Sequence, residues 1–452
     1  MATRAIPHAQ ARPIRLAVLA LAWPVMTEMA LQTLTQMVDM AMVGRLGATS
    51  IAAVGISFRP LFIGHAIFLG LGTAATAMVA RFIGAGEKSQ ANHAAEQALL
   101  SSLALALAFG AALWLWSDQI IIAMGGTGML VALGGAYIRG LAPGMVCMLM
   151  SIILTSSLRG AGDSRTPMQV NLVANVINVF GNYVLIFGHF GFPRWEVYGA
   201  AVATSFARAV ALAALLVIAV RGKKAVSISP GRLARPDWNL IRRMFRIGMP
   251  AALERVVLSV GLAVHLRLVT GLGTVAIAAA TLAGNVEQLS FMPALGFSVA
   301  SSALVGQSLG ARDPARARAA AWESTRLCAV FMGAMGLAFF LFPTGFLRLF
   351  TDDPLVLAPG ATLLRIVALA QLPTALAQVL AGGLRGAGDT SSVLYITLVS
   401  TGLCRIGLTF LLVIMLGYGL SAAWLAVVVD WGLRAFLAWR RFEAGNWQHT
   451  RV

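Results

Sequence analysis

One stretch of this chain decides its fold, because it occurs twice. It reads Ser157-Leu158-Arg159-Gly160-Ala161-Gly162-Asp163-Ser164 and returns, 226 positions later, as Gly383-Leu384-Arg385-Gly386-Ala387-Gly388-Asp389-Thr390. The same offset pairs Pro24 with Pro250. One offset that holds without a gap from residue 24 to about 164 indicates two copies of a single unit, with the functional site expected between them.

Composition places both copies in a membrane. Hydrophobic residues make up 59% of the chain, charged residues only 11%, and the mean hydropathy is +0.82. Continuous apolar runs of bilayer length indicate twelve helices, six in each copy. They are expected near 15–43, 49–78, 92–116, 128–153, 166–188, 197–220, 244–270, 275–303, 317–343, 356–381, 391–416 and 419–439.

The basic excess, a net charge of +17, reports topology rather than nucleic-acid binding. Lys and Arg gather in alternate loops, which by the positive-inside rule places both termini in the cytoplasm. The basic residues of these loops are Arg4, Arg12, Arg15, Arg81, Lys88, Arg221, Lys223, Lys224, Arg232, Arg235, Arg242, Arg243, Arg246, Arg312, Arg316, Arg318, Arg440 and Arg441.

Six helices are an even number, so both copies enter the membrane from the same side. We therefore expect an all-α integral membrane protein with two pseudo-symmetric six-helix lobes around a central cavity, related as a parallel repeat. The expected parts are a cytoplasmic tail (1–14), an N-lobe (15–220), a basic linker (221–243), a C-lobe (244–440) and a C-terminal tail (441–452). The internal two-fold removes any need for a dimer, so we expect a monomer. Cys147, Cys328 and Cys404 lie in apolar runs and are expected to be core residues.

The first helix carries the richest set of polar residues, which are Glu28, Gln32, Thr35, Gln36 and Asp39. The two acids are about 16 Å apart along one helical face. Ionisable groups in a spanning helix are costly unless paired or hydrated, so this face should line a wet cavity. Met37 and neighbouring methionines either form an adaptable wall of that cavity or fill the core.

The fifth helix has a second polar face, made by Asn171, Asn175, Asn178 and Asn182. These amides either join neighbouring helices by hydrogen bonds or, for the last two, meet Asp39. Thr204 either joins them or bonds its own backbone carbonyl.

The second copy keeps the architecture but not the chemistry. Glu254 repeats Glu28, and both acids are either functional or make equivalent structural contacts to backbone near the bends. At the same offset, His265 stands at the position of Asp39. Cys404 stands at the position of Asn178, and Leu408 at that of Asn182.

Three further intramembrane charges, Glu287, Arg405 and Asp430, suggest a structural lock. The acids would pair with Arg405, Arg267 or Arg434. The repeated Leu-Arg-Gly-Ala-Gly-Asp stretch lacks the Walker spacing and is expected to be a turn, with Asp163 or Asp389 capping the next helix. No Gly-x-Ser-x-Gly, His-Glu-x-x-His or Walker motif occurs, so we expect no enzyme and no cofactor.

Together these residues resemble the multidrug and toxic compound extrusion (MATE) family of the MOP superfamily, in the pattern of its DinF-type branch. The resemblance covers the chain and rests on three stretches. They are the first helix from Pro24 through Val38-Asp39 to Val43-Gly44-Arg45-Leu46-Gly47, the Leu158–Asp163 turn with its asparagine helix, and Val305-Gly306-Gln307-Ser308-Leu309-Gly310-Ala311.

The resemblance implies export of organic, often cationic, compounds in exchange for H⁺ or Na⁺ at a bacterial inner membrane. Asp39 matches the family's cation-coupling aspartate, Asn178 an asparagine of the same site, and Thr204 lies near a threonine ligand. Asn182 stands where many DinF-type members carry a second aspartate, so this site has one fewer negative charge. If Na⁺ is the ion, Asp39 and Asn178 would be its ligands.

From these patterns, the expected coupling set is Asp39, Asn178, Asn182, Thr204 and Glu28, and the expected substrate cavity holds Gln32, Gln36, Asn175, Met37, Glu254 and His265. The competing hypothesis is a lipid-linked oligosaccharide flippase of the same superfamily. Such proteins usually have fourteen helices and arginine-lined cavities, whereas this chain predicts twelve helices and an acidic, amide-rich first lobe.

Overall fold

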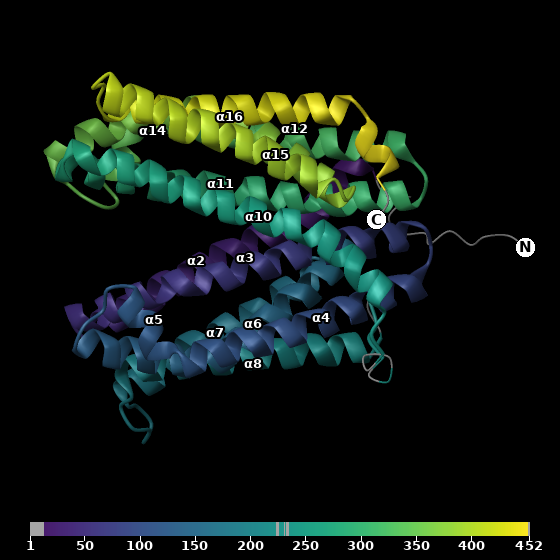
Figure 1. Cartoon of the computed structure of the whole chain (residues 1–452), viewed down its shortest axis with the longest axis horizontal. Helices are drawn as coiled ribbons and strands as arrows, with labels where there is room; N and C mark the ends of the chain where they lie inside the picture. The colour runs from purple at the N-terminus through teal and green to yellow at the C-terminus, as the bar shows by residue number, and fades with distance from the viewer. Residues whose placement is uncertain (1–12, 223–225, 230, 232–234, 451–452) are drawn as a thin grey trace, which may run out of the picture. The chain divides into compact units, whose positions relative to one another are not determined.

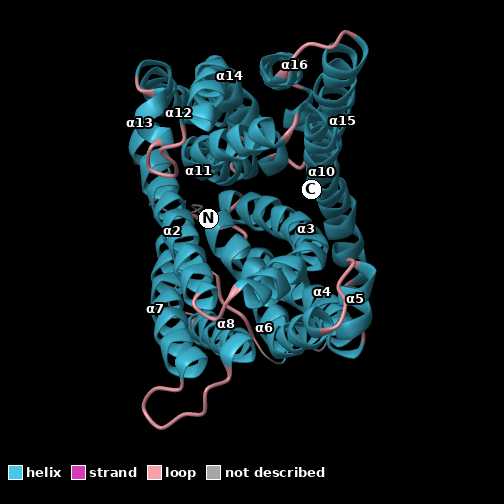
Figure 2. Cartoon of the chain, turned by 90° about the vertical axis from the view of Figure 1, so that its left-hand side faces the viewer, coloured by secondary structure: helices cyan, strands magenta, loops and turns pink. Residues whose placement is uncertain are grey.

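The computed structural model describes residues 13–222, 226–229, 231 and 235–450. Every regular element in these ranges is a helix (Figure 2). Among them, twelve helices are long and apolar enough to cross a membrane, which confirms the predicted number. The charges at Arg4, Arg12, Lys223, Lys224 and Arg232 lie outside the described residues.

Figure 1 colours the helices in chain order, from purple at the N-terminus to yellow at the C-terminus. The first half contains α2 (Ile14–Gly44), α3 (Ala48–Gly84), α4 (Lys88–Leu115), α5 (Ser117–Ala123), α6 (Met129–Gly160), α7 (Arg165–Phe187) and α8 (Glu196–Val220). The second half contains α10 (Trp238–Val269), η1 (Thr270–Leu272), α11 (Thr274–Gly310), α12 (Pro314–Leu341), α13 (Pro343–Leu347), α14 (Pro354–Gly386), α15 (Thr390–Ser400), η2 (Thr401–Leu408), η3 (Phe410–Met415), α16 (Leu420–Glu443) and η4 (Asn446–His449).

The chain forms two compact units whose boundaries fall inside helices. The N-unit contains residues 27–83 and 87–252, and the C-unit contains the chain up to residue 26, residues 84–86 and the chain from 253 onward. The first turns of α2 therefore belong to the C-unit, where Val18 and Leu21 pack into one apolar cluster with Phe297. The sequence places boundaries only at loops, because the apolar runs of α2 and α10 continue through these points.

Close helix contacts repeat in both units. In the N-unit a Cβ on Gly70 would lie 2.7 Å from the Cβ of Ala252 in α10. In the C-unit a Cβ on Gly296 would lie 3.1 Å from the carbonyl oxygen of Ala22 in α2. Gly296 lies 226 positions after Gly70, and Ala252 lies 226 positions plus one helical turn after Ala22. The repeat is therefore preserved in helix packing as well as in sequence.

The duplicated stretch forms a turn, as predicted. The preceding helices end at Gly160 and Gly386, and Gly162 and Gly388 have φ of 91° and 88°. Glycine adopts this left-handed conformation without the steric cost of a Cβ, which explains its place in both copies.

The capping prediction holds for one copy only. The Asp163 carboxylate accepts from the backbone N–H of Thr166 (3.0 Å) and from its hydroxyl (2.6 Å). Asp389 makes no such backbone cap, and instead accepts from the Ser392 hydroxyl (2.7 Å) and Arg441 Nε (2.8 Å). The expected cap at Asp389 is therefore wrong, because a charge-assisted bond to Arg441 occupies the carboxylate.

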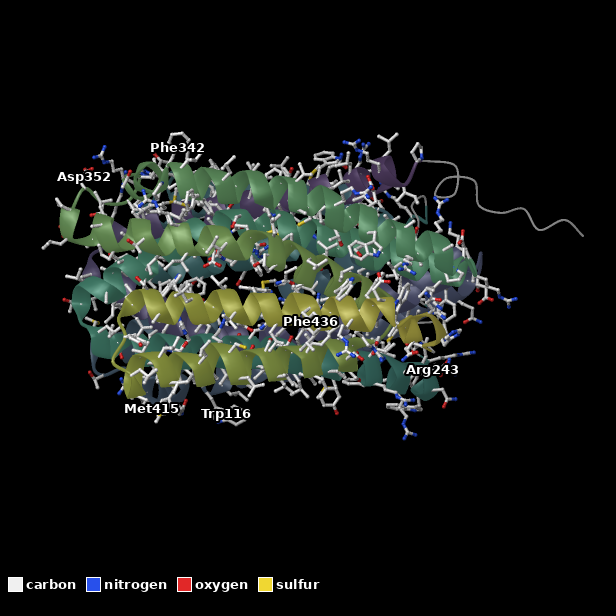
Figure 3. The ribbon with its side chains drawn as sticks, turned by 90° about the horizontal axis from the view of Figure 1, so that it is seen from above. Trp116, Arg243, Phe342, Asp352, Met415 and Phe436 are labelled. Atoms are coloured by element: carbon white, nitrogen blue, oxygen red, sulfur yellow. The ribbon has the colours of Figure 1, made fainter. Side chains whose placement is uncertain are left out.

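The C-unit helices run alternately up and down. Phe342 at the end of α12, Asp352 before α14 and Met415 at the end of η3 lie at one end of the unit (Figure 3). Helix ends that alternate in this way are the arrangement expected for successive membrane crossings.

The linker between the halves is held on α4 by side chains of the N-unit. Asn92 accepts from the backbone N–H of Ser227 (2.9 Å) and Gln97 from that of Asp237 (2.9 Å). Asp237 immediately precedes α10, and the backbone N–H of Leu240 and the His93 ring hold the pKa of its carboxyl below the usual range. This end of the linker is thus an ordered helix start.

Candidate functional site: an acid–amide cluster in the N-unit

Asp39 of α2 meets two asparagines of α7. Asn182 Nδ2 donates to Asp39 Oδ1 at 2.6 Å. With its amide oriented to satisfy the surrounding acceptors, Asn178 Nδ2 donates to both Asp39 oxygens, at 3.0 and 3.1 Å. Three of the predicted coupling residues therefore converge, although they come from helices 143 residues apart in sequence.

Thr204 of α8 completes the cluster. Its hydroxyl lies 3.0 Å from the Asn178 amide and 2.9 Å from the Ala200 carbonyl oxygen. Thr204 therefore makes both of the expected contacts, one with an asparagine of α7 and one with its own helix backbone. A hydroxyl has a single proton, so it can donate to only one of these two partners at a time.

Glu28 lies apart from this cluster. Its carboxylate accepts from Arg159 (2.7 Å) and Asn171 (2.9 Å). In the C-unit Glu254 accepts from Arg385 at 2.6 and 3.1 Å. The two acids make equivalent contacts, but to the arginines of the duplicated stretch rather than to backbone, so the backbone contacts expected for them are wrong.

The C-unit position equivalent to Asp39 is buried and basic. His265 Nδ1 lies 3.2 Å from Thr409 Oγ1, its Nε2 is buried without a hydrogen-bond partner, and Trp424 packs edge-on at 5.5 Å. The expected equivalence of Asn182 with Leu408 is wrong. The π-helical segments η2 and η3 change the register, so that Thr409 faces His265.

The predicted ionic lock exists around Asp430, which is fully buried. Arg405 Nε lies 2.8 Å from one of its carboxylate oxygens and Arg434 3.2 Å from the other. Glu287 forms no ion pair with any residue of the described part, and Arg267 bonds Thr270 instead of an acid. The lock therefore uses one of the two expected acids.

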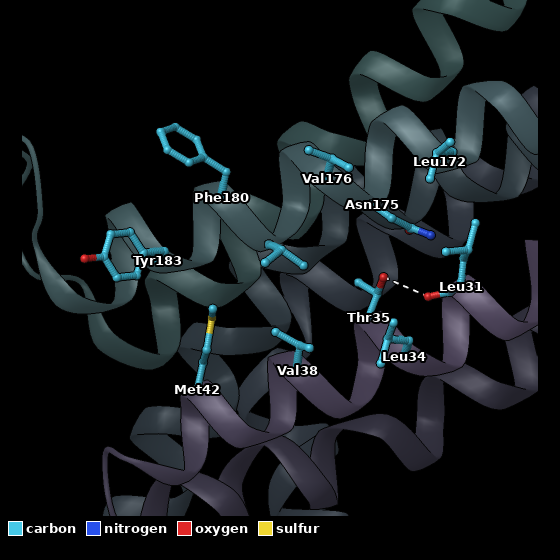
Figure 4. A pocket seen from close by; sticks show the side chains of 11 residues that line it. Leu31, Leu34, Thr35, Val38, Met42, Leu172, Asn175, Val176, Phe180 and Tyr183 are labelled. Atoms are coloured by element: carbon cyan, nitrogen blue, oxygen red, sulfur yellow. Dashed lines mark hydrogen bonds between the residues drawn. The ribbon is translucent and has the colours of Figure 1, made fainter.

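An apolar pocket of about 520 Å³ lies between α2 and α7 in the N-unit (Figure 4). Of the predicted cavity residues it contains Asn175, whereas Gln32, Gln36 and Met37 are not among its lining residues, and Glu254 and His265 belong to the C-unit. Its lining residues are Leu31, Leu34, Thr35, Val38, Met42, Leu172, Asn175, Val176, Val179, Phe180 and Tyr183. Apolar walls with few polar groups suit an amphipathic organic ligand.

Two neighbours of Asp39 were missed by sequence reasoning. Tyr137 of α6, which is 5% exposed, and Arg208 of α8 both interact electrostatically with Asp39. Arg208 had a detectable signal, since it is an arginine inside the apolar run 197–220. Tyr137 had none, because tyrosine is common in apolar helices.

The site offers oxygen atoms that could bind a cation as ligands. Among the described residues no group of three His, Cys, Asp or Glu side chains could hold a metal ion. Asp39 supplies one carboxylate, and Asn182 Oδ1 is buried without a hydrogen-bond partner. A single carboxylate with amide oxygens suits a monovalent cation or a proton.

The chain is similar to known proteins over nearly its whole length. The MatE family model matches residues 24–184 and again 250–411. The chain is 32% identical over 451 residues to the "Probable multidrug resistance protein NorM" of Thermotoga maritima, covering 99% of this chain and 96% of that protein. It is 30% identical over 431 residues to the protein of the same name from Bradyrhizobium diazoefficiens, covering 94% and 92%.

A crystal structure of MATE in the straight conformation shares 25% identity with a TM-score of 0.89, covering 97% of this chain and 98% of that one. The chain belongs to the MATE family of multi-pass membrane transporters. It is thus a transporter and not an enzyme, as expected from its motifs.

Proposed function

We propose that this protein is a secondary antiporter that exports organic, cationic or amphipathic compounds in exchange for H⁺ or Na⁺. The observation that carries the proposal is the contact of Asp39 with Asn178 and Asn182 in a membrane-spanning bundle. An intramembrane carboxylate is a site for a coupling ion. The multidrug names of relatives support the substrate class.

The Asn178 amide can report the charge of Asp39. When Asp39 is ionised, the amide nitrogen faces the carboxylate and the amide oxygen accepts from Thr204. When Asp39 carries a proton, its O–H can donate a hydrogen bond to the Asn178 amide oxygen. The Asn178 amide nitrogen then donates to the Thr204 hydroxyl, and Thr204 donates to the Ala200 carbonyl oxygen. Ion binding thereby changes a chain of bonds that joins α2, α7 and α8.

For Na⁺ the same residues would act as oxygen ligands. Asp39 would supply the carboxylate, and Asn178 and Asn182 would turn amide oxygens toward the ion. A bound Na⁺ would neutralise the site, as a proton does. The proposed substrate path lies in the N-unit, where it includes the apolar pocket at Asn175 and the α2 residues Gln32, Gln36 and Met37. Glu28 would assist the coupling set indirectly, because its ion pair with Arg159 fixes the position of α2.

Location and topology belong to the same proposal. We place the protein in a bacterial inner membrane with cytoplasmic termini, as a DinF-type member acting as a monomer. Two lobes would move during transport. They are residues 15–220 and 244–440, joined by the linker 221–243. The support is the alternation of basic loops along the chain.

The test is transport in proteoliposomes with separate pH and Na⁺ gradients, tracked with a fluorescent organic cation. Asp39→Asn keeps the shape of the side chain but removes its charge, so gradient-driven transport should fall to that of protein-free vesicles. Asp118→Asn makes the same change at a partly exposed acid of α5 that is bonded to Arg139, and it serves as the control for insertion and folding. Full gradient-driven transport by Asp39→Asn would refute the role of this site.

A further inference from the structure

Arg208 is an intramembrane charge with no direct partner. It lies in the middle of α8 and is half-buried, yet it makes no hydrogen bond or ion pair with any residue that the structure describes. Its electrostatic neighbours are Asp39 and Glu28. A guanidinium in such a helix is costly unless it is paired or hydrated, so an arginine without a direct partner is a candidate functional residue.

Helix register places Arg208 between the two acids in depth. Asn178 of α7 contacts Thr204 of α8, and near it a Cβ on Gly181 would lie 3.1 Å from Ala203, so the helices run antiparallel. Arg208 follows Thr204 by four residues, about 6 Å along the same face. Asn171, which binds Glu28, lies about 10 Å from Asn178 along α7 in the same direction.

Four charged side chains lie in this region of the N-unit, and two of them form an ion pair. Arg159 is bonded to Glu28, so these two charges compensate each other. Asp39 and Arg208 remain as one negative and one positive charge without a direct contact. Tyr137, the other titratable group near Asp39, is neutral at physiological pH.

We infer that Arg208 is a tethered counter-cation that competes with the coupling ion for Asp39. In the ion-free protein it compensates the Asp39 carboxylate from one turn away. Once Asp39 is neutralised, Arg208 remains as an uncompensated positive charge in the N-unit. That charge weakens ion binding enough for release and disfavours a cationic substrate in the same unit.

This inference rests on the proposed function and extends it to the control of ion affinity. Removing a positive charge near a carboxylate favours its neutral form. Arg208→Gln should therefore raise the pH midpoint of proton-driven transport by about one pH unit or more. Arg208→Lys keeps the charge and should stay near the wild-type midpoint.

The experiment measures transport of a fluorescent organic cation against external pH for the wild type and both variants. Arg139→Gln is the matched control, because Arg139 is an N-unit arginine bonded to Asp118 at 2.9 Å and is not among the charges that interact with Asp39. Its midpoint should not move. A second readout, infrared titration of the carboxylic acid band in purified protein with Asp39→Asn for assignment, applies even if a variant does not transport.

An unchanged midpoint in both transport and infrared titration of Arg208→Gln would overturn the inference. A shift in Arg208→Lys as large as that in Arg208→Gln would also overturn it, since side-chain shape and not charge would then be responsible. These outcomes leave the role of Asp39 intact. Retained gradient-driven transport by Asp39→Asn would refute the proposed function instead.

Discussion

Two carboxylates on one helix have different surroundings, and this difference separates their roles. Glu28 is bonded to a guanidinium and an amide, whereas Asp39 is bonded to amides alone. A bonded guanidinium compensates the charge of a carboxylate, whereas amides carry no charge and leave the carboxylate for a coupling ion to neutralise. The residue suited to ion exchange is therefore Asp39.

The duplicated ion pairs are expected to be structural. The Glu254 and Arg385 side chains are 3% and 10% exposed, and Glu254→Gln would leave a buried guanidinium uncompensated. We expect a loss of about 3 kcal/mol or more in unfolding free energy, seen as a lower thermal unfolding temperature in detergent. Glu28→Gln, in the more exposed pair, should lose less.

The control for this comparison is a surface pair. Glu196 is 50% exposed and lies 3.3 Å from Arg194 in the loop before the sixth spanning run, so Glu196→Gln should change stability by less than about 1 kcal/mol. If Glu254→Gln proved as stable as Glu196→Gln, the buried pair would not hold the C-unit together.

Helix contacts in this protein depend on glycines at equivalent points of the two copies. A Cβ on Gly160 would lie 2.6 Å from the carbonyl oxygen of Thr76, and one on Gly386 would be closer still to that of Ser302. Backbone cannot move aside as a flexible side chain can. These glycines therefore set the distance between α3 and α6, and between α11 and α14.

Gly386→Ala should lower the stability of the C-unit by about 2 kcal/mol, because the added methyl group meets backbone. The measurement is the thermal unfolding midpoint of the purified protein. Gly432→Ala in α16 is the matched control, since its Cβ would meet nothing within 4 Å. Equal midpoints for the two variants would show that α11 and α14 can separate without loss.

The π-helical segments show where a repeat can diverge. η2 and η3 replace α-helical turns in the second copy, and the facing partner of His265 becomes Thr409. The family model also ends one residue later in the second copy than the 226-residue offset requires. A local change of helix type thus alters one site and leaves the rest of the repeat in register.

The proposed topology assigns each loop of the chain to one side of the membrane. Single cysteines at Ser89, in the first turn of α4, and at Asp352, just before α14, should differ in access from outside the cell. In a background without Cys147, Cys328 and Cys404, a membrane-impermeant maleimide should label Asp352→Cys in intact cells. Ser89→Cys should react only after lysis, and labelling of Ser89→Cys in intact cells would contradict cytoplasmic termini.

The number of helices, the duplication and the candidate acid Asp39 follow from the amino-acid sequence alone. Apolar length identifies a spanning helix, and a constant offset identifies a repeat, because both are properties of linear order. Asp39 and the asparagines stood out for a similar reason, since polar groups are rare in such runs.

Partners across the fold were not readable in this way. The pairing of Glu28 with Arg159, the shift to Thr409 and the Arg441 contact of Asp389 depend on helix register and distance. Linear order states which groups a helix carries, but hydrogen bonds and ion pairs require atoms within a few ångströms. Those distances arise only when helices far apart in the chain pack together.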